Sequence, residues 1–198
     1  LNIYMKLIYK EDEEGKEGLF SEDGKHQVMM EWEKEYMNAC IEKLNPTGRV
    51  LEIGFGMGYS ADKIQTYKDI ESHTIIECNP VVLEKLKEYK KEHPNVIIVQ
   101  GRWQDVLQTC NKFDSIFFDD YVIDDQNTIM ENNNNIVRFN HFLYEVLMNH
   151  TNINTKIAVY SGNKFMLRNK IDCIEYDNTE FSVDIPKYCK YVSGDKMY

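Results

Sequence analysis

The sequence predicts an α/β fold, a doubly wound and mostly parallel sheet that ends in an antiparallel C-terminal edge. One observation is the stretch Val50-Leu51-Glu52-Ile53, a short apolar run that turns into a glycine-spaced loop and then a helical pattern. A strand, a tight turn and a helix N-terminus follow one another in this way in open α/β sheets. The other is that apolar runs alternate with helical patterns until Phe181, Val183 and Ile185 recur with a period of two.

The first 45 residues precede the glycine loop and are predicted to contain one long helix. Residues 1–9 are apolar and fit an edge strand or a packed arm. Residues 11–24 are acidic and punctuated by glycine, which is typical of a mobile loop. From 27 to 44, apolar residues recur at three- and four-residue spacing, which predicts a helix. Pro46 ends it, because proline disfavours helical backbone at the preceding residue.

Strands and helices then alternate in the order that a doubly wound sheet requires. The predicted strands after the loop cover residues 73–78, 95–100, 113–119 and 156–160. Helical patterns lie between them at residues 60–65, 80–89, 105–107 and 136–150. Asn79 and Pro80 supply an N-cap and an N1 proline for the second of these helices. The asparagine-rich residues 124–135 are predicted to be a loop, while segments 174–185 and 188–198 are expected to pair as antiparallel strands.

Length and charge narrow the classes of protein to consider. A chain of 198 residues is long enough for one domain with a sizeable core. The formal net charge of −10 argues against non-specific nucleic-acid binding, which needs a basic surface. Five cysteines without C-x-x-C spacing favour reduced thiols over disulfides or zinc. With no apolar run near the roughly 18 residues of a membrane span and no signal-peptide pattern, we expect a cytoplasmic protein without a membrane partner.

The spacing of the glycines indicates which class of cofactor the loop binds. Gly54, Gly56 and Gly58 form G-x-G-x-G, whereas the dinucleotide fingerprint needs its third glycine one position later, where Tyr59 stands. A nicotinamide cofactor is therefore disfavoured, and S-adenosylmethionine is favoured. A glycine loop alone is weak support, since many turns carry two glycines.

Residues at the ends of the predicted strands strengthen the case for a cofactor site, because ligands bind off the carboxyl ends of such strands. Glu77 lies about 20 residues past the glycines, where a carboxylate accepts hydrogen bonds from ribose hydroxyls. Trp103 and Gln104 suit an adenine ring and its amino group. Taken singly, Glu77 also fits a solvated strand end and Trp103 fits the core. Asp119 with Asp120 fits a loop cap. Their occurrence at successive strand ends favours a site.

Several of these segments resemble guanidinoacetate N-methyltransferase and the related arginine δ-N-methyltransferases of fungi. The resemblance runs from about Gly24 to Tyr160. It rests on Trp-Glu at 32–33 and on blocks in fixed order at residues 50–57, 75–79, 101–105 and 113–119. It implies a class I methyltransferase with a seven-stranded sheet and S-adenosylmethionine as cofactor. Residues 1–45 would form an arm and leading helix over the active site, and residues 46–198 a Rossmann-like core, together one domain.

The same resemblance implies roles for individual residues. It places Glu33 and Asp119 as the carboxylates that grip the guanidino group of the substrate. It places around the cofactor Met29, Met37, Gly54, Phe55, Gly56, Met57, Gly58, Tyr59, Glu77, Cys78, Asn79, Trp103 and Gln104, with Asp119 adjoining them.

The chain also departs from the family pattern at several positions. Gln104 stands where the family usually has Glu, Asp120 where it usually has Thr, and Val122 replaces a proline. Residues 161–164 differ from the family segment that meets the substrate carboxylate. The acceptor therefore stays open between a guanidino compound, arginine (free or in a peptide) and another amine. A non-catalytic cofactor-binding protein is the alternative from another class.

Two carboxylates fit the chemistry of a guanidino acceptor. A guanidinium is a poor nucleophile, because its lone pairs are delocalised and its pKa exceeds about 12. Making it neutral at pH 7 costs about 8 kcal/mol, from roughly six pKa units at ~1.36 kcal/mol each. One carboxylate, Glu33, can hold the planar group while the other, Asp119, accepts its proton, and no metal is required.

Overall fold

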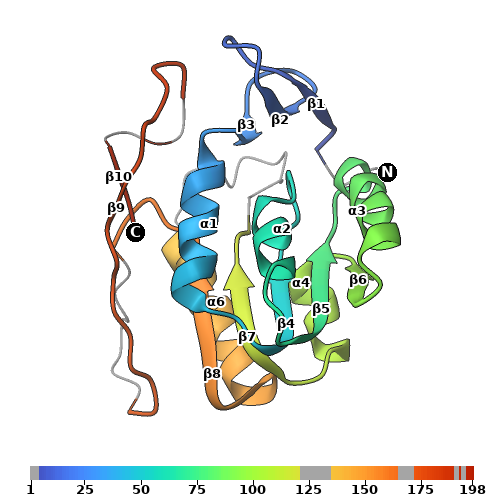
Figure 1. Ribbon diagram of the computed structural model, residues 1–198, viewed down its shortest axis with the longest axis vertical. Coiled ribbons are helices and arrows are strands. Elements are labelled where there is room, and N and C mark those ends of the chain that lie inside the picture. The colour runs from blue at the N-terminus through green and yellow to red at the C-terminus, as the bar shows by residue number, and fades with distance from the viewer. Residues whose placement is uncertain (1–4, 121–134, 165–171, 190–191, 193–194) are drawn as a thin grey trace.

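The computed structural model describes residues 5–120, 135–164, 172–189, 192 and 195–198 (Figure 1). Its centre is a five-stranded sheet, all parallel, in the order β6-β5-β4-β7-β8. These strands are β4 (Gly48–Ile53), β5 (Ile70–Glu77), β6 (Val96–Gln100), β7 (Phe113–Phe118) and β8 (Thr151–Val159). The doubly wound fold is thereby confirmed.

The strand order creates a switch point between β4 and β7. From β4 the chain winds outward through β5 to β6, and it then returns to the other side of β4 for β7 and β8. Ligands of doubly wound sheets bind outside the carboxyl ends of the strands at such a point. The glycine loop follows β4 and Asp119 follows β7, so both lie at that crevice.

Helices cover both faces of this sheet (Figure 1). They are α1 (Glu33–Leu44), α2 (Tyr59–Gln65), α3 (Pro80–Glu92), α4 (Trp103–Val106) with the 3₁₀ turn η1 (Leu107–Thr109), and α6 (Asn135–Asn149). Helices α1, α2 and α3 pack on one face around Val50 and Phe117. Helices α4 and α6 pack on the other around Leu51 and Phe118. Adjacent strand residues therefore point to opposite layers, as the period of two requires.

The sheet is smaller than the resemblance implied. Seven strands were expected, and five join the central sheet in the described part of the chain. The C-terminal strands are short, β9 (Phe181–Ser182) and β10 (Lys196–Met197), and they form a separate antiparallel pair. Figure 1 shows this pair beside α1, where the Phe181 ring lies edge-on to Tyr36 at 5.7 Å. Strand β9 covers only part of the predicted segment 174–185, because residues 175–178 are exposed and add no buried face to a strand. Strand β10 covers two of the described residues of the predicted segment 188–198.

The N-terminal region also differs from its prediction. Strands β1 (Leu7–Glu11), β2 (Glu17–Ser21) and β3 (Gln27–Met29) form an antiparallel sheet where a mobile loop and a helix start were expected. Asp12 orders the hairpin turn by accepting the N–H groups of Glu14 and Lys16. The helix begins only at Glu33. Local spacing missed this sheet because its burial depends on contacts with distant parts of the chain.

The other expected elements are present with small shifts at their ends. Asn79 caps α3 as predicted, since its side chain accepts the Val81 N–H at 3.0 Å and Pro80 is the first helical residue. The predicted loop at 124–135 lies almost entirely outside the described residues. No helix within the described ranges combines the length and apolar character needed to cross a membrane.

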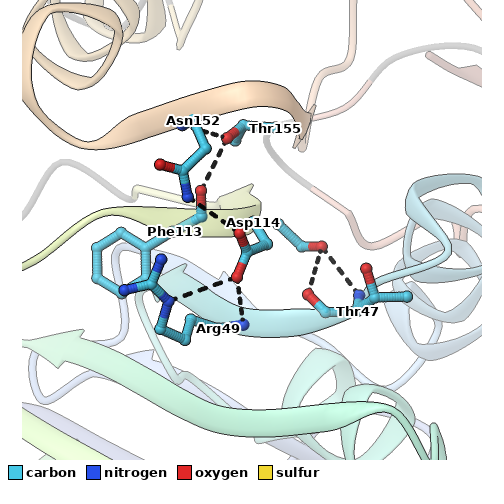
Figure 2. Close-up of polar contacts among 7 residues, drawn as sticks. Thr47, Arg49, Phe113, Asp114, Asn152 and Thr155 are labelled. Atoms are coloured by element: carbon cyan, nitrogen blue, oxygen red, sulfur yellow. Dashed lines mark hydrogen bonds and ion pairs between the residues drawn. The ribbon is translucent and has the colours of Figure 1, made fainter.

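At the amino ends of the strands, a polar network ties β4, β7 and β8 together (Figure 2). Asp114 accepts the Arg49 backbone N–H at 2.9 Å and the Asn152 amide at 3.0 Å. The Ser115 hydroxyl exchanges hydrogen bonds with the backbone of Thr47. These bonds join the strands at the edge opposite to the glycine loop and help to set their register.

Candidate active site

The glycine loop joins β4 to α2 and is held against two other segments. Gly54 and Gly56 have φ values of +84° and +52°, in the left-handed region that favours glycine. A Cβ on Gly54 would lie 2.4 Å from the carbonyl oxygen of Asp119. A Cβ on Gly56 would lie 2.7 Å from the sulfur of Met29. The loop therefore needs glycine at both positions to approach β7 and β3 this closely.

Glu77 ends β5 next to this loop, with its side chain buried. One oxygen accepts the Phe55 N–H at 3.0 Å, and the other accepts the N–H groups of Cys78 and Asn79, both at 2.7 Å. Burial raises the pKa of Glu77, and these three bonds oppose that rise. A carboxylate has about four lone-pair positions. Three are used by the backbone, which leaves room for one further donor such as a ribose hydroxyl.

The N-terminal sheet lies over the glycine loop (Figure 1). The Tyr9 hydroxyl on β1 donates to the carbonyl oxygen of Gly56 at 2.9 Å. The Met57 N–H points to the sulfur of Met29 at 3.2 Å. Met29 thus contacts the loop, whereas Met37 is fully buried in the core. Contact of either residue with a cofactor stays a prediction. This sheet is a part of the site's surroundings that the sequence did not reveal.

Glu33, the first residue of α1, is 2% exposed and is fixed at both oxygens. Oε1 accepts the Met30 N–H and Oε2 accepts the Tyr160 hydroxyl, both at 2.7 Å. The backbone N–H of Tyr160 in turn donates to the carbonyl of Phe118 at 2.9 Å. Tyr160 therefore connects Glu33 to the carboxyl end of β7, where Asp119 lies. Sequence reasoning assigned Tyr160 only to a strand and missed this contact.

Asp119 directly follows β7, and its N–H donates to Ile53 at 3.1 Å. Because Phe117 packs against the α1 layer and Phe118 against the α6 layer, alternation turns Asp119 toward α1. The pKa of Asp119 lies well above its ordinary value. Burial is the largest cause, and the negative charge of Glu33 is the next. The structure thus brings the two predicted carboxylates into one electrostatic neighbourhood, and a cation between them would relieve their repulsion.

Trp103 and Gln104 fit the cofactor interpretation less directly. Trp103 is 3% exposed, and its ring packs edge-on against Phe118 and Phe142 in the core. Its indole N–H donates to Asp120 at 2.6 Å. Gln104 is exposed on α4. Most of the Trp103 side chain therefore packs in the core, which is the alternative that the sequence left open. Contact of Trp103 or Gln104 with a cofactor stays a prediction.

A second buried polar group under the glycine loop was missed by sequence reasoning. Glu52 and His73 are both fully buried, with Oε2 and Nε2 2.8 Å apart. Ser60, at the start of α2, donates to Glu52, and Gln65 bonds to the other nitrogen of His73 at 3.2 Å. The available signal in the sequence was Glu52, a charged residue inside an apolar strand, which indicates a buried polar partner. This network fixes α2 relative to β4 and β5, from below the loop.

Fold and site together define a class of protein: a doubly wound α/β protein with a nucleoside-type cofactor edge beside two carboxylates, the buried Glu33 and the half-buried Asp119. The family model described as Guanidinoacetate N-methyltransferase matches residues 20–175. The chain belongs to this family. The family match supports S-adenosylmethionine as the cofactor, and the glycine cradle with the Glu77 carboxylate fits a nucleoside with ribose hydroxyls.

Curated relatives of this chain are also named as methyltransferases. Protein arginine N-methyltransferase 2 of Candida glabrata is 40% identical over 122 residues, which are 58% of this chain and 28% of that protein. The Saccharomyces cerevisiae protein of the same name is 38% identical over 128 residues, covering 59% and 29%. That of Aspergillus fumigatus is 41% identical over 101 residues, covering 48% and 24%. The chain spans less than a third of these relatives' length.

Proposed function

We propose that this chain is an S-adenosylmethionine-dependent N-methyltransferase that methylates a guanidino group, in guanidinoacetate, arginine or a related compound. The observation that carries the proposal is the pairing of Glu33 with Asp119 next to the glycine loop. The names of the relatives support an arginine-type acceptor. The net charge of −10 suits a cationic substrate.

The two carboxylates have different roles in this proposal. Glu33 is held by Met30 and Tyr160, so its carboxylate is fixed in place to orient the planar guanidinium. Asp119 has a raised pKa, which makes it a stronger base than an ordinary aspartate. As the new N–C bond forms, Asp119 takes the proton from the attacking nitrogen. The lone pair released in this way is what the delocalised guanidinium lacks.

On the cofactor side, we assign the glycine loop, Glu77 and Met29 as the residues that hold S-adenosylmethionine. The cofactor supplies a methyl group on a sulfonium, whose bonding electrons remain on sulfur when the methyl leaves. Glu77 offers its free lone pair to a ribose hydroxyl, and the loop lets the ligand lie against backbone. Cys78, Asn79, Trp103 and Gln104 are proposed to border the same site.

The test is methyl transfer from labelled S-adenosylmethionine to a panel of acceptors. Guanidinoacetate, free arginine and an arginine peptide are the guanidino arm, and lysine, ornithine and glycine are the matched amine arm. We expect label in at least one guanidino compound and none in the amines. Cofactor binding by calorimetry without transfer to any guanidino compound would overturn the proposal.

A second candidate is transfer to another amine, and one observation favours it. The Ser161 hydroxyl donates to the Asn163 carbonyl at 2.6 Å, and the Asn163 N–H returns to that hydroxyl at 3.2 Å. This closed turn lies where the family meets the substrate carboxylate, so the acceptor's tail is recognised differently here. Label in the amine arm alone would select this candidate. Cofactor binding without transfer to either arm would instead indicate a non-catalytic cofactor-binding protein.

Location and organisation are also proposals. All five cysteines are unpaired, which supports a reducing compartment such as the cytoplasm. Contacts such as that of Tyr9 with Gly56 support a single unit in which residues 1–45 cover the site of residues 46–198. A protease-resistant fragment lacking the N-terminal sheet, with unchanged cofactor affinity, would contradict that organisation.

A further inference from the structure

Asp119 and Asp120 are adjacent in the chain but face opposite layers of the fold. Asp119 turns toward α1 and Glu33, as the alternation along β7 requires. Asp120 turns toward α4 and α6, where its Oδ2 accepts the Trp103 indole N–H and forms an ion pair with Nη2 of Arg138. The side chains of Asp120 and Arg138 are 16% and 14% exposed. Asp120 therefore anchors the end of β7 to the second helix layer.

Arg138 stands among several acids at this edge. The charged groups that act on Asp119 are Glu33 on α1, Glu52 on β4, Asp120 beside it, and Arg138 on α6. The Tyr36 hydroxyl and the Cys40 thiol on α1 also face Asp119. Burial raises the pKa of both groups and keeps them neutral. Arg138 is the one cation in this set. Its Nη1 is buried and has no hydrogen-bond partner in the described part of the chain.

Asp120 brings a second carboxylate to this end of β7, directly beside Asp119. An extra carboxylate next to Asp119 makes it harder for Asp119 to ionise. Arg138 cancels that charge at short range. The two residues are therefore best understood as one neutral unit behind the reactive carboxylate.

We propose that Arg138 is a positioning residue: through Asp120 it holds the end of β7 so that Asp119 faces Glu33, and it offsets the charge of Asp120 so that Asp119 meets the substrate as a carboxylate. Arg138 itself does not touch the reacting atoms. The catalytic meaning of this inference rests on the proposed function, whereas its electrostatic content does not.

The experiment measures the titration of Asp119 in four variants of the full chain. The Asp119 carboxyl carbon is identified by ¹³C NMR as the signal lost in Asp119→Asn. In Arg138→Gln we expect its midpoint to rise by about one pH unit or more, since a close opposite charge shifts a carboxyl pKa by ~1–3 units. In Asp120→Asn the midpoint should fall. The double variant should titrate close to wild type, and Arg138→Lys, which keeps the charge, should move little.

Two further outcomes bear on the inference. An unchanged midpoint in Arg138→Gln, or an equal rise in Arg138→Lys, would overturn it. If Arg138→Gln does not fold, the fall in Asp120→Asn and its reversal in the double variant decide instead, and no fall would overturn the inference.

Activity separates this inference from the proposed function. In a folded Arg138→Gln, the acidic limb of the kcat/KM profile should move to higher pH by the same amount, with cofactor affinity unchanged. A loss of rate equal at all pH values would indicate a merely structural role and overturn the inference. Wild-type protein that methylates no guanidino compound would overturn the proposed function, and the NMR titration would still decide the role of Arg138.

Discussion

Strand β7 carries an aspartate near each end, and the two have opposite environments. Asp114, at the amino end, accepts N–H groups from Arg49 and Asn152 (Figure 2). Its pKa is lowered, chiefly by the Arg49 backbone hydrogen bond. Asp119, at the carboxyl end, has a raised pKa because of burial and the charge of Glu33. One strand thus uses the same residue type for holding strands together and, in our proposal, for accepting a proton.

The difference lies in what surrounds each carboxylate. Asp114 lies at the partly exposed edge, where donors and water satisfy its charge, so the anion is the favoured form. Asp119 lies at the switch point, among other acids, so the fold disfavours its anion. Strained electrostatics of this kind are typical of functional sites and reduce stability there. Four measurements test whether the two carboxyl environments differ in this way.

The largest expected effect is on turnover in Asp119→Asn. Removing the proton acceptor should lower kcat/KM for the guanidino substrate by about 10³-fold or more, because general-base catalysis contributes ~10²–10⁴ and the residue also binds the cation. The dissociation constant for S-adenosylmethionine, measured by calorimetry, should stay within about twofold, since Glu77 and the loop are untouched. Joint loss of turnover and cofactor binding would assign Asp119 to the cofactor instead.

Glu33→Gln should have the next largest effect. The amide keeps the shape but loses the charge that orients the guanidinium, so we expect kcat/KM to fall about 10²-fold, with much of the change in KM. Steady-state kinetics check this. Glu35→Gln is the matched control, because Glu35 is exposed on the same helix turn and should change little. Equal losses in both variants would show that helix α1, and not the Glu33 carboxylate, is what matters.

A smaller effect, of opposite sign, is expected on stability. The folded pKa of Asp119 is raised, so the unfolded chain ionises first and the fold is penalised once the pH passes the ordinary value of 3.8. Asp119→Asn should therefore raise the melting temperature near pH 7 by roughly 2–4 °C, the shift that ~1 kcal/mol produces in a chain of this size. The gain should vanish as the pH falls toward that value. A gain independent of pH would contradict the electrostatic origin.

Asp114→Asn should show the reverse. Its folded pKa is lowered, so its stabilising contribution is present above the unfolded value of 3.8 and is lost as the pH falls through the folded pKa. We expect a loss of about 1 kcal/mol at pH 7, the usual net value of such a hydrogen bond at a partly exposed site. Denaturant unfolding in a series of buffers from pH 7 down through 3.8 and below measures it, with kcat/KM unchanged. A destabilisation that does not shrink anywhere below 3.8 would point to packing instead.

Local patterns predicted the elements whose signals are contained in short stretches. The glycine loop, the parallel core strands and the Asn79 cap were found because period, turn chemistry and capping are properties of neighbouring residues. The N-terminal sheet was missed for the opposite reason. Residues 11–24 have the composition of a polar loop. They form strands because the flanking residues Tyr9 and Met29 contact the glycine loop, which lies far along the chain.

Local pattern and the order of the strands were enough to predict the doubly wound class, the sheet edge at which ligands of such folds bind, and the residue types available there for chemistry. Three features became visible only in the folded molecule: Tyr160 holds Glu33, Arg138 pairs with Asp120, and the pKa values of Asp114 and Asp119 shift in opposite directions. These depend on which distant side chains share a volume and how much water reaches it. Burial and long-range charge are properties of the packed molecule, and no stretch of sequence contains them.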